Sequence, residues 1–328
     1  MINNLIVRQY QNSDFSLWNS FIEESKNATF LFHRDFMEYH SDRFQDYSLL
    51  IFDEKDKLKA ILPANTDGKI VYSHQGLTYG GLVLLQNTKL QEVIAMMNMV
   101  LRFLHDQQFV SLQLKQLPSI YSEFPSDEME QLCFLLKAQL VRRDALAVID
   151  LSHKMDISRV RKRGIERGQK LELVIKEVSD FEEFWTKMLV PNLQERYAVK
   201  PVHSLAEITH LKAKFPDNIR QFNVYFENDI IGGVTLFVTK NVLHPQYISG
   251  NKKFNTKYGG LDFLYHYIMA TVATSQRYFN FGSSSENNGL QLNTSLHYWK
   301  ESFGGRTVVQ NYYEIETKNY TLLDTVLL

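Results

Sequence analysis

Residues 257–264 of the chain read KYGGLDFL, with two glycines immediately before a long helical pattern. The polar and basic run NKKFNT precedes them, and helix-forming and apolar residues continue to Ala273. Gly259 and Gly260 are therefore predicted to lie at a helix N-terminus, where unpaired N–H groups and the helix dipole favour a negative group. The alternative is a simple bend into the helix, for which glycine supplies its free φ.

The string Tyr-Gly-Gly-Leu also occurs in the first half of the chain, in SHQGLTYGGLVLL at 73–85. In both halves it follows a predicted strand and precedes a predicted helix. Hydrophobic periodicity and turn residues predict the other elements. In the first half we expect strands at 5–10, 47–52, 58–66, 69–74, 109–117 and 145–151, and helices at 14–25, 33–44 and 89–106. In the second half we expect helices at 156–168, 181–197, 205–214 and 261–273, and strands at 171–178, within 220–250 (three) and at 277–282.

Each half thus runs through helices, an antiparallel meander, a helix and a strand, which is an α+β layout used twice. We predict an N-terminal domain over 1–150, a C-terminal domain over 151–310, and a final strand or tail over 311–328 that can return to either domain.

Composition excludes several classes of function. The 328 residues are 44% hydrophobic and 22% charged with a net charge of −1, so binding of a polyanion would need a local patch. The single cysteine, Cys133, excludes an internal disulfide, and its apolar neighbours predict a core residue rather than a catalytic thiol. No H-E-x-x-H, Walker A, G-x-S-x-G or G-x-G-x-x-G motif occurs, and we expect no metal. With neither a signal-peptide pattern nor a long apolar run, we expect a cytoplasmic protein without a membrane span.

The meander, glycine loop and following strand resemble the GNAT acyltransferases, and their repetition resembles the FemABX-like branch with two GNAT-like domains. The resemblance rests on short segments of the sequence. They are SHQGLTYGG (73–81), RVRKRGIERGQKLELVIKEV (159–178), IIGGVTLFVTKNVLHPQYISGNKKFNTKYGG (230–260), RYFNFGSSSENNGLQ (277–291) and HYWKESFGG (297–305).

This resemblance implies an N-acyltransferase that moves an acyl group from a thioester, such as acyl-CoA, acetyl-CoA or an acyl carrier protein, to an amine. The acceptor implied is a small molecule, an amino sugar on a nucleotide, or a cell-envelope precursor. Its amine would attack the acyl donor directly, without a covalent enzyme intermediate. The loop FNTKYGG differs from the Q/R-x-x-G-x-G/A of CoA-binding GNATs, and the sequence shows no long charged coiled-coil insertion. Two alternatives stay open: an aminoacyl-tRNA-dependent peptidoglycan aminoacyltransferase, and a non-catalytic binding module.

Acyl transfer to an amine needs a neutral nucleophile, an oxyanion stabiliser and a proton path. Glu286, just beyond a predicted strand, is the first candidate to deprotonate or orient the amine, and the alternative is a loop carboxylate or helix cap. His244 in the VLHPQY hairpin could do the same or lie at the surface. Asn280, between aromatic residues, could orient the acyl carbonyl or make a structural hydrogen bond.

The donor and acceptor candidates are mainly basic and aromatic residues. The predicted donor site, with help from Lys252, comprises Lys253, Lys257, Tyr258, Gly259 and Gly260. The predicted acceptor site comprises His33, Arg34, His74, Tyr79, Arg163 and Lys300, each with an ordinary structural or surface role as its alternative. Arg159, Arg163 and Arg167 share one helix face, which could bind a nucleotide phosphate or an RNA acceptor stem, or simply be solvated.

Overall fold

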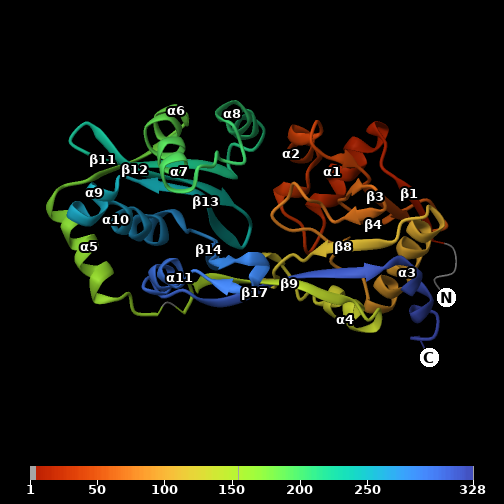
Figure 1. Ribbon diagram of the computed structural model, residues 1–328. Coiled ribbons are helices and arrows are strands. Elements are labelled where there is room, and N and C mark those ends of the chain that lie inside the picture. The colour runs from red at the N-terminus through yellow and green to blue at the C-terminus, as the bar shows by residue number, and fades with distance from the viewer. Residues whose placement is uncertain (1–4, 154, 328) are drawn as a thin grey trace. The chain divides into compact units, whose positions relative to one another are not determined.

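The chain folds into two compact units, each with its own strands, helices and hydrophobic core (Figure 1). A computed structural model describes residues 5–153 and 155–327, apart from the side chains of residues 197, 252, 253 and 256. Unit 1 comprises residues 1–144, 287–290 and 309–328, and unit 2 comprises residues 145–286 and 291–308. The chain passes from one unit to the other within strands β9 (Gln139–Asp150) and β17 (Arg306–Glu316).

The strands of unit 1 form two groups. An antiparallel sheet has the order β1-β3-β4-β7, with β1 at Ile6–Gln9, β3 at Leu49–Phe52, β4 at Leu58–Leu62 and β7 at Val83–Leu84. The second group has the order β17-β8-β6-β5-β2, with β8 at Ser111–Lys115, β6 at Ile70–Tyr72, β5 at Asn65–Asp67 and β2 at Gln45–Asp46. Within it, β8 runs parallel to β6 and antiparallel to β17.

The core of unit 1 lies beneath its long helix. The helices are α1 (Phe15–Glu23), α2 (Arg34–Met37), α3 (Leu90–Asp106) and α4 (Glu128–Leu135). Short 3₁₀ turns are η1 (Asn12–Asp14), η2 (Phe30–Phe32), η3 (Glu38–His40), η4 (Ser119–Tyr121), η7 (Asn287–Gly289) and η8 (Thr317–Leu323). Along α3, Val93, Met97, Val100 and Leu104 are buried at helical spacing, so this face packs into the core as the periodicity predicted.

The strands of unit 2 follow the order β10-β11-β12-β13-β14-β9. Their bounds are β10 at Val174–Val178, β11 at Ile219–Phe226, β12 at Asp229–Val238, β13 at Val242–Gly250 and β14 at Tyr278–Ser283, with a hairpin of β15 (Ser285–Glu286) and β16 (Gln291–Leu292) beside them. The strands β10 to β13 are antiparallel, whereas β14 runs parallel to β13 and antiparallel to β9. The predicted mostly antiparallel α+β architecture is therefore confirmed.

Helices cover both faces of the unit 2 strands. They are α5 (Arg159–Lys170), α6 (Glu182–Phe184), α7 (Val190–Tyr197), α8 (Leu205–Lys214), α9 (Lys252–Tyr258), α10 (Gly260–Tyr267) and α11 (Thr294–Glu301), with π-helical segments η5 (Trp185–Leu189) and η6 (Ile268–Val272). Adjacent glycines on β12 permit this arrangement, because a Cβ on Gly232 would lie 3.1 Å from Leu261 of α10 and one on Gly233 2.7 Å from Phe184 of α6. Successive strand residues point to opposite faces, so α6 and α10 pack on opposite sides of β12 (Figure 1).

The two units repeat one arrangement. In each, a long helix precedes a strand that has a parallel neighbour on one side and an antiparallel neighbour on the other: α3 precedes β8, and α10 precedes β14. The two Tyr-Gly-Gly-Leu strings differ locally. In unit 1, Gly80 forms a parallel bridge with Gln116, and α3 begins only at Leu90.

In unit 2 the residues before the glycines form helix α9, where the sequence predicted a polar loop. Gly259 adopts φ +74° and joins α9 to α10, which begins at Gly260. Because helical hydrogen bonds continue across the junction, from Gly259 N to Asn255 O and from Phe263 N to Gly259 O, the segment is a bent helix.

Candidate functional site

The main candidate site of unit 2 lies where β13 and β14 separate. These fully described parallel strands pair only at Val242↔Tyr278 and Leu243↔Phe279. At the next residue, the Nδ1–H of His244 donates to the carbonyl oxygen of Asn280 at 2.9 Å, so a side chain takes the place of a ladder bond. The register of β13 against β12 also shifts at this level, which marks a β-bulge. The strands therefore open beside a bulge, with an imidazole at the start of the opening.

Lys300 of α11 reaches the same strand end. The residue is 4% exposed, and Nζ donates to the carbonyl oxygens of Gly282 at 3.0 Å and Ser283 at 2.6 Å. An ammonium carries three N–H donors, and within the described part of the chain no third acceptor contacts this one. Burial lowers the pKa of Lys300 to about 8. A cation that titrates near neutral pH thus lies at the opening, with one donor left for a ligand.

The protonation state of His244 follows from its surroundings. Burial, and to a smaller extent the charge of Lys300, lowers the pKa of His244 to about 4, although the bond to the Asn280 carbonyl opposes this. The ring is therefore neutral at pH 7, and since a carbonyl can only accept, Nδ1 carries the proton. The remaining nitrogen, Nε2, is a hydrogen-bond acceptor, which suits the orientation of an amine N–H.

Asn280 shapes the strand end. Its side-chain Oδ1 accepts from the backbone N–H of Gly282 at 2.8 Å, and Gly282 adopts φ +76°. The pairing of β14 with β9 shifts register between Asn280 and Ser283, so this bond stabilises a second bulge. Asn280, His244 and Lys300, three residues predicted from sequence, are therefore brought together around the carbonyls of this bulge.

Glu286 lies apart from this cluster in its contacts. It is exposed on β15, and its Oε1 accepts from the Asn293 side chain at 2.8 Å. Asn293 in turn caps α11 by accepting from Leu296 N at 3.0 Å. In this structure Glu286 supports the cap of the helix that carries Lys300, which corresponds to the loop-carboxylate alternative.

Close packing accounts for Gly259 in the predicted donor segment. A Cβ at Gly259 would lie 2.2 Å from the carbonyl oxygen of Gly164 on α5, a distance that real side chains do not tolerate. Gly259 and Gly260 are both buried. The exposed Lys257 places Nζ 4.9 Å from the ring centre of Tyr258, whose ring stacks on Phe254 at 5.3 Å. The side chain of Lys253 lies outside the described residues, as does that of Lys252.

Helix α5 has one face against α10 and one basic face in solvent. On the inner face, Arg161 pairs with the buried Asp262 of α10 at 2.6 Å. Burial raises the pKa of Asp262, and the charge of Arg161 opposes the shift. On the outer face Arg159, Lys162, Arg163, Arg167 and Lys170 are all exposed. Lys162 lies 3.9 Å from Asp156, and Glu166 is exposed on the same helix, but within the described residues Arg163 has no ion-pair partner. This face, which we call the α5 basic face, therefore carries a net positive charge.

The predicted acceptor residues of unit 1 have structural contacts. Arg34 is buried, pairs with Glu38 at 2.6 Å and Asp46 at 3.1 Å, and stacks over a tyrosine ring at 3.7 Å. The hydroxyl of the buried Tyr79 donates to Thr29 at 3.0 Å. These contacts favour the structural alternative for Arg34 and Tyr79.

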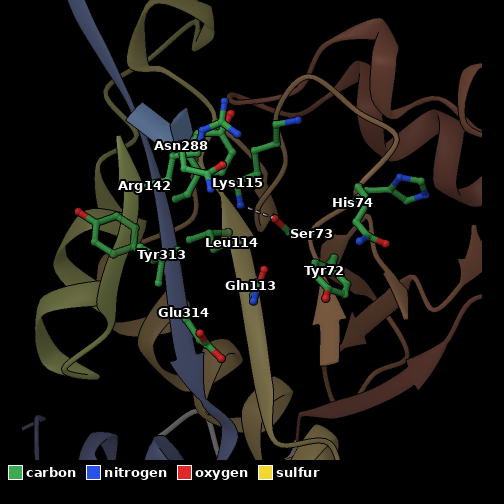
Figure 2. A pocket seen from close by; sticks show the side chains of 13 residues that line it. Tyr72, Ser73, His74, Gln113, Leu114, Lys115, Arg142, Asn288, Tyr313 and Glu314 are labelled. Atoms are coloured by element: carbon green, nitrogen blue, oxygen red, sulfur yellow. Dashed lines mark hydrogen bonds between the residues drawn. The ribbon is translucent and has the colours of Figure 1, made fainter. Parts of the chain in front are cut away.

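The two histidines of the predicted acceptor site, His33 and His74, differ in their environment. His33 makes a 2.9 Å pair with Glu23. His74 is buried, stacks on the His40 ring at 5.0 Å, and has its pKa lowered to about 3 by burial. His74 also borders a cavity of about 460 Å³ in unit 1 (Figure 2). Sequence analysis missed Lys115 and Arg142, which line this cavity. The polar alternation in SLQLK at 111–115 was the available signal, but strand faces cannot be oriented without their partners.

The structure also bears on the predictions about a reactive thiol, a metal site and a membrane span. Cys133 is buried, and burial raises its pKa to about 12, so the thiol is un-ionised and belongs to the core of unit 1. In the described ranges no group of three or more metal-ligating side chains gathers. Among the helices of residues 5–153 and 155–327, none combines the length and apolar character of a membrane span.

Comparisons with known proteins bear on the fold. No protein-family model matches the chain, and no curated protein sequence does. Among solved structures, the match with FemX covers 97% of this chain and 99% of FemX, with a TM-score of 0.68 and 9% sequence identity. The match with L-PGS from Bacillus licheniformis covers 96% of this chain and 96% of L-PGS, with a TM-score of 0.60 and 11% sequence identity. The match with a tandem GNAT protein from the clavulanic acid biosynthesis pathway covers 96% of this chain and 99% of that protein, with a TM-score of 0.51 and 10% sequence identity.

At these identities the likeness establishes architecture alone. It extends over nearly the whole chain, and it agrees with the repeated helix–strand arrangement of the two units. The resemblance inferred from the sequence segments is thereby confirmed at the level of the fold: the chain has a FemX-like fold built from two GNAT-type units.

Proposed function

We propose that the chain is a transferase that moves an acyl or aminoacyl group from an activated ester or thioester to an amine, at the opening between β13 and β14. The observation that carries this proposal is Lys300, a buried ammonium fixed by the carbonyls of Gly282 and Ser283 with a third donor available. A tetrahedral intermediate of acyl transfer develops an oxyanion, and a pre-oriented cationic donor in a site of low dielectric stabilises it strongly.

His244 supplies the complementary contact for the acceptor. With Nδ1–H held by the Asn280 carbonyl, Nε2 presents a lone pair that can orient the N–H of a neutral amine. A pKa of about 4 makes this imidazole a weak base, so we assign it positioning of the amine. The amine would attack the donor carbonyl directly, and the proton lost from nitrogen would pass to the leaving group or to water.

For the donor we propose an aminoacyl ester of tRNA, the alternative carried by the FemABX-like resemblance. The packing of α5 against Gly259 and the burial of Gly260 leave little room for a pyrophosphate at the start of α10, which argues against acyl-CoA there. The exposed α5 basic face suits the phosphodiester backbone of tRNA, even though the net charge of the whole chain is −1. The acceptor would then be an amine of a cell-envelope precursor, and the protein would act in the cytoplasm.

The test is a donor panel with hydroxylamine as a small surrogate amine. The protein is incubated with total aminoacyl-tRNA, acetyl-CoA or a longer acyl-CoA, and hydroxamate formation is measured. We expect acceleration with aminoacyl-tRNA only, and weakened donor binding at raised salt or after Arg163→Gln with Arg167→Gln. Acceleration with a CoA ester alone would replace the proposed donor, and no acceleration with any donor would favour a binding module.

A further inference from the structure

The cavity of unit 1 is built on one face of a strand group. Its volume of about 460 Å³ falls within the roughly 300–1,000 Å³ typical of small-molecule sites. On this face Tyr72 lies opposite Gln113, Gln113 opposite Glu314, and Tyr312 opposite Lys115. The alternate residues Leu112 and Ile315 are buried in the core on the other face. The polar face is therefore turned into the cavity by the strand register, and its side chains are fixed by neighbouring strands.

Lys115 is a cation without a counter-charge in direct contact. Its Nζ donates to the carbonyl oxygen of Leu77 at 2.6 Å, and in the described ranges no carboxylate lies within ion-pair distance of it. Burial is the main cause that lowers the pKa of Lys115 to about 8; the charge of Arg142 adds to the effect, and the charge of Asp144 opposes it. Half-burying a charge without a partner is unfavourable, so an anion placed here would be stabilised.

Arg142 presents a second cation at the same end of the cavity. Its Nε and Nη2 donate to Asp144 at 2.9 and 2.7 Å, and the guanidinium carbon lies 4.6 Å from the ring centre of Tyr312. Asp144 thus holds the guanidinium plane in place and leaves its other N–H groups available. Figure 2 shows Lys115 and Arg142 together near Asn288, with Glu314 toward the other end and the His74 ring turned away from Lys115.

We propose that this cavity binds a small molecule through an anionic group, a carboxylate or a phosphate, held between Lys115 and Arg142 with the rest of the ligand along Tyr312 and Gln113. The two cations supply charge-assisted donors, and the tyrosine ring supplies a flat apolar wall. Glu314 confines the anion to the far end, because a second negative charge near it would be repelled. This site lies wholly within unit 1 and does not depend on the transfer chemistry proposed for unit 2.

The test uses three probes that share one ring: phenyl phosphate, benzoate and the neutral benzyl alcohol. Calorimetric titration of the full chain should show binding of one or both anions and none of benzyl alcohol, and the two anionic probes distinguish a phosphate from a carboxylate site. Lys115→Met and Arg142→Gln should each weaken binding about ten- to a hundredfold. The exposed Lys55→Gln, in a turn of the same unit, should leave binding unchanged.

A variant of opposite sign guards against loss of folding. Glu314→Gln removes the only carboxylate among the lining residues and should tighten binding of the anionic probe. Thermal unfolding shows whether each variant is folded. If Lys115→Met does not fold, the affinity of Arg142→Gln for the anionic probes decides the test. The proposal is overturned if neither anion binds, or if the anions bind with native affinity to both folded Lys115→Met and Arg142→Gln.

Discussion

The contact between α5 and α10 makes a strong prediction about the glycines of the KYGG segment. We expect Gly259→Ala to destabilise unit 2, whereas Gly260→Ala should be nearly neutral. An alanine at φ +74° costs about 1–2 kcal/mol in backbone strain. Its Cβ would also lie 2.2 Å from a backbone oxygen of Gly164, which forces the helices apart at a further cost of about 1–3 kcal/mol. Together these terms give about 2–5 kcal/mol.

The neighbouring glycines provide matched controls. At Gly260 the new Cβ would meet a flexible side-chain end, Cδ1 of Ile231, at 3.0 Å, and alanine gains up to about 1 kcal/mol of helix propensity. Gly68 has φ +61° with nothing within 4 Å of its Cβ position, so Gly68→Ala measures backbone strain alone. Gly259→Ala should therefore lose more stability than Gly68→Ala by the cost of the helix contact.

Urea unfolding followed by tryptophan fluorescence measures these differences. Trp185 and Trp299 report on unit 2, so Gly259→Ala and Gly260→Ala are measured in a Trp18→Phe background. Gly68 lies in unit 1, so Gly68→Ala is measured from Trp18 in a background with Trp185→Phe and Trp299→Phe. The midpoint and slope are compared for each variant, since a change in slope alone would indicate that the units no longer unfold in a two-state manner. Equal stability losses in Gly259→Ala and Gly68→Ala would refute the reasoning, because the backbone contact would then contribute nothing.

Three further predictions concern buried charge and reactivity. Lys300 has its pKa lowered from 10.5 to about 8, so the unfolded chain binds more protons between these values, and stability should rise with pH across that window by up to roughly 3 kcal/mol from this group. In pH-dependent urea titrations Lys300→Met should remove this contribution and leave that of Lys115, whose pKa is also lowered to about 8. Arg34→Met should lower the stability of unit 1 by roughly 2–3 kcal/mol, measured by calorimetry. Breaking a fully buried pair costs ~3–5 kcal/mol, and the cost here is smaller because the carboxylate partners of Arg34 reach water. The control Arg43→Met, at an exposed arginine, should change the stability by less than about 0.5 kcal/mol. Cys133 should resist iodoacetamide at pH 8 until urea unfolds unit 1; rapid labelling of the native protein would contradict its buried, un-ionised state.

Local signals predicted much of the fold. The helix over 205–214 coincides with α8, where Ser204 and Glu207 form a capping box. The meander at 220–250 appears as β11 to β13 because alternating apolar residues and clear turns set its strands. These elements depend on residues close together in the chain, so the sequence alone was sufficient.

Features that depend on distant partners were not predictable in the same way. The polar run before Lys257 has no amphipathic pattern, yet it forms α9, which packs beside α5 and α10. The role of Gly259 depends on Gly164, nearly a hundred residues earlier, and no local pattern records that contact. Similarly, Lys115 and Arg142 meet only through the register of strands from distant parts of the chain.

The candidate site was partly predictable for a related reason. His244, Asn280 and Lys300 stood out as polar groups among aromatic or apolar neighbours, where burial demands partners. Glu286 stood out as the carboxylate nearest a strand end, but the hydrogen bond that it accepts from Asn293 could be recognised only from the hairpin of β15 and β16.

The central claim is that Lys300 stabilises the transition state of acyl transfer, and its most direct test is the single-turnover rate of aminoacyl transfer from aminoacyl-tRNA to hydroxylamine. Lys187→Met is the control, because Lys187 is an exposed lysine of the same unit that pairs with Glu183. The account predicts that Lys300→Met lowers the rate about 10²–10³-fold without weakening donor binding, while Lys187→Met keeps the native rate. A folded Lys300→Met variant that transfers at the native rate would contradict the account.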